Sequence, residues 1–85
     1  NSIANLKTFP NPASTVLNIS FVNEGVSNNS LKLYDLQGRL VKELFNGTIA
    51  GEFNERYSVL DLSPGMYILN IQNEKGFIQE RIIVQ

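Results

Sequence analysis

The 85-residue sequence contains no cysteine, no histidine and no tryptophan. Without cysteine or histidine the chain has no disulfide, no zinc site of the usual structural kind and no nucleophile–histidine pair. The groups left for acid–base chemistry are eight carboxylates, which fall in predicted turns or on predicted polar strand faces. Acidic side chains in such places are mostly solvated. The composition therefore predicts a domain that is not an enzyme and needs no metal or other cofactor.

An excess of charge of one sign is also lacking. Seven basic and eight acidic side chains give a formal net charge of −1, and both signs are scattered along the chain. Such a chain has no basic face for nucleic acid. It also has no apolar run of about 18 residues that could span a membrane, and no charged-then-apolar signal peptide at its start. We therefore expect a secreted protein to carry its export signal upstream, on a longer parent chain.

Apolar residues recur with a period of two, as in Leu17, Ile19 and Phe21, which alternate with Asn18 and Ser20. This period is typical of a strand with one buried face. It predicts strands at residues 6–9, 15–21, 30–36, 39–45, 52–59, 66–72 and 77–84. About seven short antiparallel strands predict an all-β, immunoglobulin-like sandwich that forms a single domain over residues 1–85. Residues 1–5 are expected to be the end of a linker from an upstream domain.

Turn signals rich in Gly, Asn and Pro separate these runs. They lie at residues 23–25, 28–29, 37–38, 46–47, 63–65 and 73–76. Two hairpins are predicted, one turning at residues 35–39 with Gly38 in the left-handed region and one turning at residues 73–76. Most of the asparagines are expected in turns or on solvent faces, where a short amide bonds its own backbone.

The segment 62–67 is similar to the tyrosine corner of β-sandwiches. In that motif a tyrosine at the start of a strand hydrogen-bonds to the backbone just upstream. Tyr67 would be that tyrosine here. The alternative is an ordinary turn followed by a core tyrosine.

Four landmarks occur in order along the chain. They are Phe9-Pro10-Asn11-Pro12, residues 33–41 around Gly38, residues 60–71 around Pro64 and Gly65, and the apolar terminus Arg81-Ile82-Ile83-Val84-Gln85. Together they resemble the C-terminal sorting domain of proteins exported by the type IX secretion system of Bacteroidota-type bacteria. The resemblance extends from Leu6 to Gln85.

The resemblance implies a function. In that family the domain is the last module of a large secreted protein and directs this cargo across the outer membrane. A translocon recognises the folded domain in the periplasm, and a sortase-like surface peptidase usually removes it. The expected locations are therefore the periplasm in transit, then the cell surface or the extracellular space. Cleavage is expected at or before residues 1–5, and the domain itself catalyses nothing.

The candidate residues for translocon recognition are Gly65, Tyr67 and the tail Arg81, Ile82, Ile83, Val84 and Gln85. If the final strand lies at a sheet edge, its free backbone groups can extend a partner's sheet. The alternative is that Ile82 and Val84 complete the core, and both can hold. Phe9, Pro10, Asn11 and Pro12 are expected to form an extended lead-in from the linker to the first strand.

Two other classes of binding domain fit the sequence. The first is a structural spacer or adhesion module of the immunoglobulin or fibronectin type III kind, which has the same sandwich and turn signals. The second is a carbohydrate-binding module, which the missing tryptophan disfavours. The aromatic residues that could be exposed, Tyr34, Phe45, Phe53 and Phe77, are scattered along the chain and are expected to be rim packing.

Overall fold

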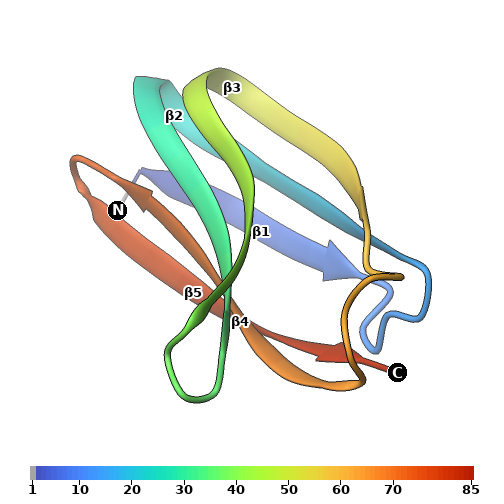
Figure 1. Ribbon diagram of the computed structural model, residues 1–85. Coiled ribbons are helices and arrows are strands. Elements are labelled where there is room, and N and C mark those ends of the chain that lie inside the picture. The colour runs from blue at the N-terminus through green and yellow to red at the C-terminus, as the bar shows by residue number, and fades with distance from the viewer. Residues whose placement is uncertain (1) are drawn as a thin grey trace.

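The computed structural model describes residues 2–85 and shows an antiparallel all-β fold (Figure 1). Its strands are β1 (Ile3–Phe9), β2 (Val16–Asp35), β3 (Leu40–Ser58), β4 (Gly65–Asn73) and β5 (Gly76–Val84). The predicted fold class is confirmed. Of the expected linker end, residue 1 lies outside the described residues, Ser2 is buried, and β1 begins at Ile3.

The predicted number of seven strands is wrong, because the described residues form five. The predicted strands 15–21 and 30–36 are two parts of β2, and 39–45 and 52–59 are two parts of β3. The two long strands pair from Val16–Ser58 through to Tyr34–Leu40. The signals at residues 23–25, 28–29 and 46–47 therefore do not form the predicted turns.

A bulge explains why Asn and Gly occur inside these strands. The β2–β3 register shifts between Asn23 and Val26, next to the pairing of Asn23 with Gly51. Gly25 and Gly51 have φ values of 80° and 78°. Glycine adopts this left-handed region without the cost that a Cβ atom brings, and a bulge bends and twists the strand that carries it. Figure 1 shows β2 and β3 curving together at this corner.

The corner lets each long strand serve two layers. The first half of β2 pairs with β1 on one side and with the second half of β3 on the other, which forms one layer. The second half of β2 pairs with the first half of β3 on one side and with β4 on the other, and β5 completes that layer. Two layers of a sandwich thus arise from strands that cross between them at a bulge.

The core lies between the layers and follows the predicted alternation. Its buried hydrophobic residues are Ile3, Ala13, Leu17, Ile19, Phe21, Leu31, Leu33, Ile49, Phe53, Val59, Tyr67, Leu69, Ile71, Ile82 and Val84. The Phe53 ring stacks on Phe21 at a centroid distance of 4.8 Å and meets the Phe45 ring edge-on at 5.2 Å. Phe53, expected as possible rim packing, is therefore a core residue.

Asparagine is also used inside the molecule, where the sequence predicted mostly turns and solvent faces. Asn23 and Asn29 are each only 1% exposed. The Asn23 amide donates to Ser27 Oγ and to the Ile49 carbonyl, each at 3.0 Å. The Asn73 amide donates to Asn29 Oδ1 at 3.1 Å. This polar network ties the β4–β5 hairpin to the corner, and such a network stabilises a fold when its groups are all paired.

Candidate functional site

The four sequence landmarks meet at one end of the sandwich, opposite the corner. We call this the motif end and define it as residues 9–15, 35–41, 59–67 and 81–85. Strand pairing joins its segments, because Asp35 pairs with Tyr67 and Tyr67 pairs with Ile82. Val84 pairs with Gly65 and also bridges to Ala13. In Figure 1 the β1–β2 and β3–β4 connections lie beside the C-terminus, and the β2–β3 turn projects below β4 and β5.

The turn at residues 35–39 is built around the carboxylate of Asp35. Its Oδ1 accepts the backbone N–H groups of Gln37 and Arg39 at 2.9 and 3.0 Å, and its Oδ2 accepts Arg39 Nε at 2.8 Å. Gly38 has a φ of 84°, so the predicted left-handed glycine is confirmed. The backbone N–H of Arg39 is the main cause that lowers the pKa of Asp35, since hydrogen bonds favour the charged carboxylate.

The predicted tyrosine corner is confirmed. The Tyr67 hydroxyl donates to the Ser63 carbonyl at 2.6 Å, and the side chain is buried. A second contact holds the same loop, because Lys42 Nζ donates to the Asp61 carboxylate at 3.0 Å. This hydrogen bond is the main cause that lowers the pKa of Asp61. The loop before β4 is therefore fixed at two points.

A hollow of about 460 Å³ lies between the turn at residues 35–39 and the loop at residues 61–67. Apolar side chains on its wall, Leu36, Val41 and Met66, stand beside the polar groups of that turn. Binding sites are typically concave, with apolar walls and a few fixed polar groups. The hollow is therefore a candidate binding feature of the motif end.

Exposed apolar side chains concentrate at the motif end, and two of them, Leu36 and Val41, line this hollow. Of the eight exposed large hydrophobic residues within residues 2–85, six belong to the motif end: Phe9, Leu36, Leu40, Val41, Leu60 and Ile83. Leu60 is 72% exposed and Leu36 is 62% exposed. Exposed apolar side chains that gather in one region mark interaction sites more often than isolated ones do.

The candidate recognition residues divide by burial. Tyr67, Ile82 and Val84 are buried, so the alternative that Ile82 and Val84 complete the core holds. Gly65, Arg81, Ile83 and Gln85 are exposed. Only the exposed residues are open to a partner while the domain stays folded.

β5 is the last strand of its sheet, as the recognition hypothesis requires, but the outer edge of its last residues is covered and not open. The Asn11 amide donates to the Arg81 carbonyl at 3.0 Å, and Asn11 Oδ1 accepts the Ile83 N–H at 3.0 Å. The backbone of Ala13 continues this cover, donating to the Ile83 carbonyl at 2.8 Å and accepting the Gln85 N–H at 2.9 Å. A covered edge cannot pair with another strand.

The segment Phe9-Pro10-Asn11-Pro12 is thus not the predicted lead-in to the first strand. It follows β1, connects it to β2 and lies along β5. The pairing of the Asn11 side chain with β5 could not be predicted from the sequence, because that strand begins more than sixty residues later in the chain. The only local signal was an asparagine placed between two prolines, which disfavour a helix at the residues before them. The segment is bent and not extended as predicted, and both X–Pro bonds are cis.

Within residues 2–85, no helix is long and apolar enough to cross a membrane. The same residues contain no cluster of three or more acidic, histidine or cysteine side chains suited to a metal ion.

Comparisons with known proteins agree with the geometry. A family model described as "Secretion system C-terminal sorting domain" matches residues 7–85. Among solved structures, the crystal structure of dimeric latent PorU from Porphyromonas gingivalis has a similar fold, with a TM-score of 0.72 and 18% sequence identity. The similarity covers 93% of this chain and 9% of that one. No curated protein sequence gives a significant match.

Proposed function

The chain belongs to the family of secretion system C-terminal sorting domains, and we propose that its motif end is the surface that the type IX machinery recognises. A domain of this family is the sorting signal of a type IX cargo protein. It interacts with the secretion system, and its presence implies export to the cell surface or the extracellular space. The resemblance inferred from the sequence is therefore confirmed at the level of the family.

One observation carries the proposal. Six of the eight exposed large hydrophobic residues within residues 2–85 gather at the end where the four landmarks of the family meet. Leaving apolar surface in water forgoes about 25 cal/mol for each Å² that could be buried. A partner that covers this end recovers that free energy, and the fixed turns at residues 35–39 and 61–67 keep the surface ready for it.

The exposure of the candidate residues supports a division of roles among them. Arg81, Ile83 and Gln85 are exposed beside the Asn11 segment and are the tail residues that a partner contacts in this proposal. Tyr67, Ile82 and Val84 act from the core by fixing the position of the tail. The recognised surface is thus the folded end of the sandwich, and not an added strand along residues 81–85.

The finer steps follow from the resemblance. The domain is fused to an upstream cargo, passes through the periplasm folded, and is removed by a sortase-like surface peptidase. It needs no cofactor and catalyses nothing itself. Peptidases cut exposed chain that can become extended. Because Ser2 is buried and β1 begins at Ile3, the proposed cut lies upstream of Ser2.

A reporter assay tests the proposal. A fluorescent protein with a signal peptide is fused to residues 1–85 and expressed in a type IX-competent host and in the same host without its type IX translocon. We expect reporter on the surface or in the medium only when the domain and the translocon are both present. Reporter that stays in the periplasm of the competent host, with the domain folded, would instead assign the chain to the spacer class.

A further inference from the structure

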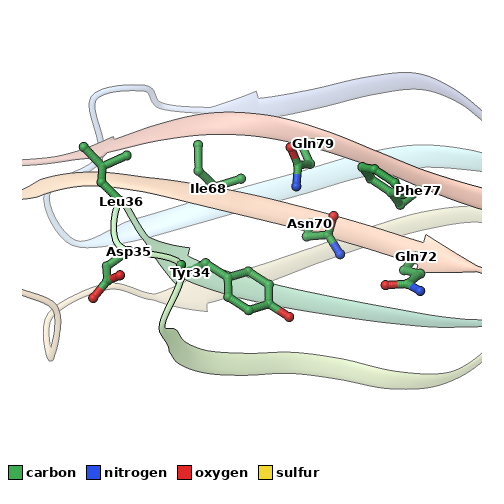
Figure 2. Close-up of a pocket in the computed structure, with 9 residues that line it drawn as sticks. Tyr34, Asp35, Leu36, Ile68, Asn70, Gln72, Phe77 and Gln79 are labelled. Atoms are coloured by element: carbon green, nitrogen blue, oxygen red, sulfur yellow. The ribbon is translucent and has the colours of Figure 1, made fainter.

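A second hollow lies on the outer face of the layer that contains β2, β4 and β5. It measures about 520 Å³, and Figure 2 shows its lining side chains spread across these three strands. Its lining follows the outer face of β4 and β5 from their hairpin end, and residues 34–36 and Gly38 close it at the motif end. The recognition surface proposed above meets this face only at the turn that carries Asp35, Leu36 and Gly38.

This second hollow is a shallow groove, and Asn70 lies in its middle with a side-chain amide that makes no hydrogen bond to the described residues. The residue is only 7% exposed, yet within residues 2–85 its side chain has no hydrogen-bond partner. No fully buried side-chain polar atom of that part of the chain is unpaired, so the Asn70 amide reaches the groove surface. A nearly buried amide gains free energy when a ligand supplies its missing hydrogen bonds.

Two further amides extend this polar centre. Gln79 pairs with Asn70 across β4 and β5, and Gln72 is two residues further along β4 on the same face. Each amide offers a carbonyl oxygen that accepts and an NH₂ group that donates. The centre of the groove thus presents three donor–acceptor groups side by side, as Figure 2 shows.

Aromatic rings lie on either side of the amides. Tyr34 is opposite Ile68 across β2 and β4, whereas Phe77 is opposite Gln72 across β4 and β5. From the usual distance between strands and the usual rise per residue, the Cα atoms of Tyr34 and Phe77 lie ~16 Å apart on a diagonal across the groove. Phe77 is 59% exposed, so solvent reaches much of its surface.

We infer that this groove binds a neutral oligosaccharide. Aromatic rings pack against the apolar C–H face of a sugar ring, and the amides pair with its hydroxyl groups. The one charged side chain in the lining, Asp35, is already bonded to Arg39. Lys32 and Arg81 occupy neighbouring register positions but do not line the groove. The lining therefore favours an uncharged, hydroxyl-rich ligand.

The face of the sheet argues against an extended peptide. Peptides that bind sheets usually add a strand to an open edge. The groove lies over β4, whose two edges are paired with β2 and β5. The aromatic residues that are scattered along the sequence, Tyr34 and Phe77, are brought to one surface only by this pairing.

Nuclear magnetic resonance of the ¹⁵N-labelled chain tests the inference, with four probes. Two are neutral, cellohexaose and mannohexaose; the others are hexagalacturonate and an unstructured Ser/Thr/Val peptide. We expect saturable shifts of the Asn70, Gln72 and Gln79 side-chain amide signals with at least one neutral probe. No saturable shift with either neutral probe, or shifts with only the acidic sugar or the peptide, would overturn the inference.

Substitutions distinguish binding at the groove from nonspecific binding elsewhere on the surface. Phe77→Ala and Gln79→Ala change exposed residues, so both variants are expected to fold, as circular dichroism can check. Phe77→Ala should weaken binding at least about tenfold, because a ring contact is lost. Phe9→Ala is the matched control, since Phe9 is also exposed but lies outside the groove. An equal loss in the control and in Phe77→Ala would contradict a site at this groove.

Discussion

The side chain of Asn11 takes the place of a neighbouring strand for Ile83, which lies 72 residues later in the chain. Its oxygen accepts the Ile83 N–H, and its amide donates to the Arg81 carbonyl, each at 3.0 Å. Together with the backbone of Ala13, this one side chain closes the edge of the last strand over its final residues. This contact makes the end of the chain part of a fixed surface.

Replacing Asn11 with Ala should expose that edge. The loss of two hydrogen bonds to backbone groups is expected to lower the free energy of unfolding by about 1–3 kcal/mol, as urea denaturation can measure. Hydrogen exchange of the Ile83 amide should become faster. Asn11→Asp is the control, because it keeps the acceptor for the Ile83 N–H but not the donor to Arg81. Unchanged exchange at Ile83 in Asn11→Ala would show that the contact does not protect the edge.

The buried amide of Asn23 should be among the most sensitive positions. Asn23→Ala removes the side-chain donor to the Ile49 carbonyl and one of the two amide donors to Ser27 Oγ, which keeps only that of Asn29. We therefore expect a loss of about 2–4 kcal/mol in the free energy of unfolding. Asn46→Ala, at an exposed position in β3, should change stability by no more than about 0.5 kcal/mol. Equal effects of the two substitutions on the denaturation midpoint would argue against the network as a stabilising element.

The bend at the corner depends on the backbone of Gly51. A Cβ atom there would meet open space, so the cost of Gly51→Ala comes from its φ of 78° and not from a clash. We expect a loss of about 1–2 kcal/mol by thermal or urea unfolding. Gly51→Asn should cost less, because asparagine enters the left-handed region more readily. The reverse order of these two variants would contradict the strain argument.

Acid should weaken the turn at residues 35–39. The pKa of Asp35 lies below its ordinary value of 3.8 in the folded chain. The stability that its charge contributes is therefore present above pH 3.8 and is lost as the pH falls through the lower folded value. Urea denaturation at a series of acidic pH values should show a smaller acid loss for Asp35→Asn than for the unmodified chain. Parallel curves for the two proteins would exclude this contribution.

Local features of the structure were predictable from the sequence. The turn around Gly38 and the hydrogen bond of Tyr67 to Ser63 each involve residues within four positions, so their residue types suffice to predict them. The alternation of Leu17, Ile19 and Phe21 also predicted their burial, because one face of a strand repeats every two residues.

The remaining features depend on contacts between distant residues. Asn and Gly at residues 23–25 and 46–47 are usual in turns, and only the pairing of β2 with β3 shows that they lie within continuous strands. The cover of β5 by Asn11 and the meeting of Tyr34 with Phe77 at one groove likewise arise from tertiary pairing. The groove therefore could not be derived from sequence spacing.

Export of two matched single-residue variants tests the central claim most directly. Deleting the last strand is less informative, because it removes the buried residues Ile82 and Val84 and so unfolds the core. Ile83→Ser instead changes an exposed apolar residue of the motif end, and Val26→Ser changes one at the opposite corner. Each variant, fused to the signal-peptide reporter, is checked for folding and quantified in the periplasm, on the surface and in the medium. The account predicts periplasmic retention of the folded Ile83→Ser fusion and normal export of the Val26→Ser fusion. Normal export of both, or retention of only Val26→Ser, would contradict recognition through the motif end.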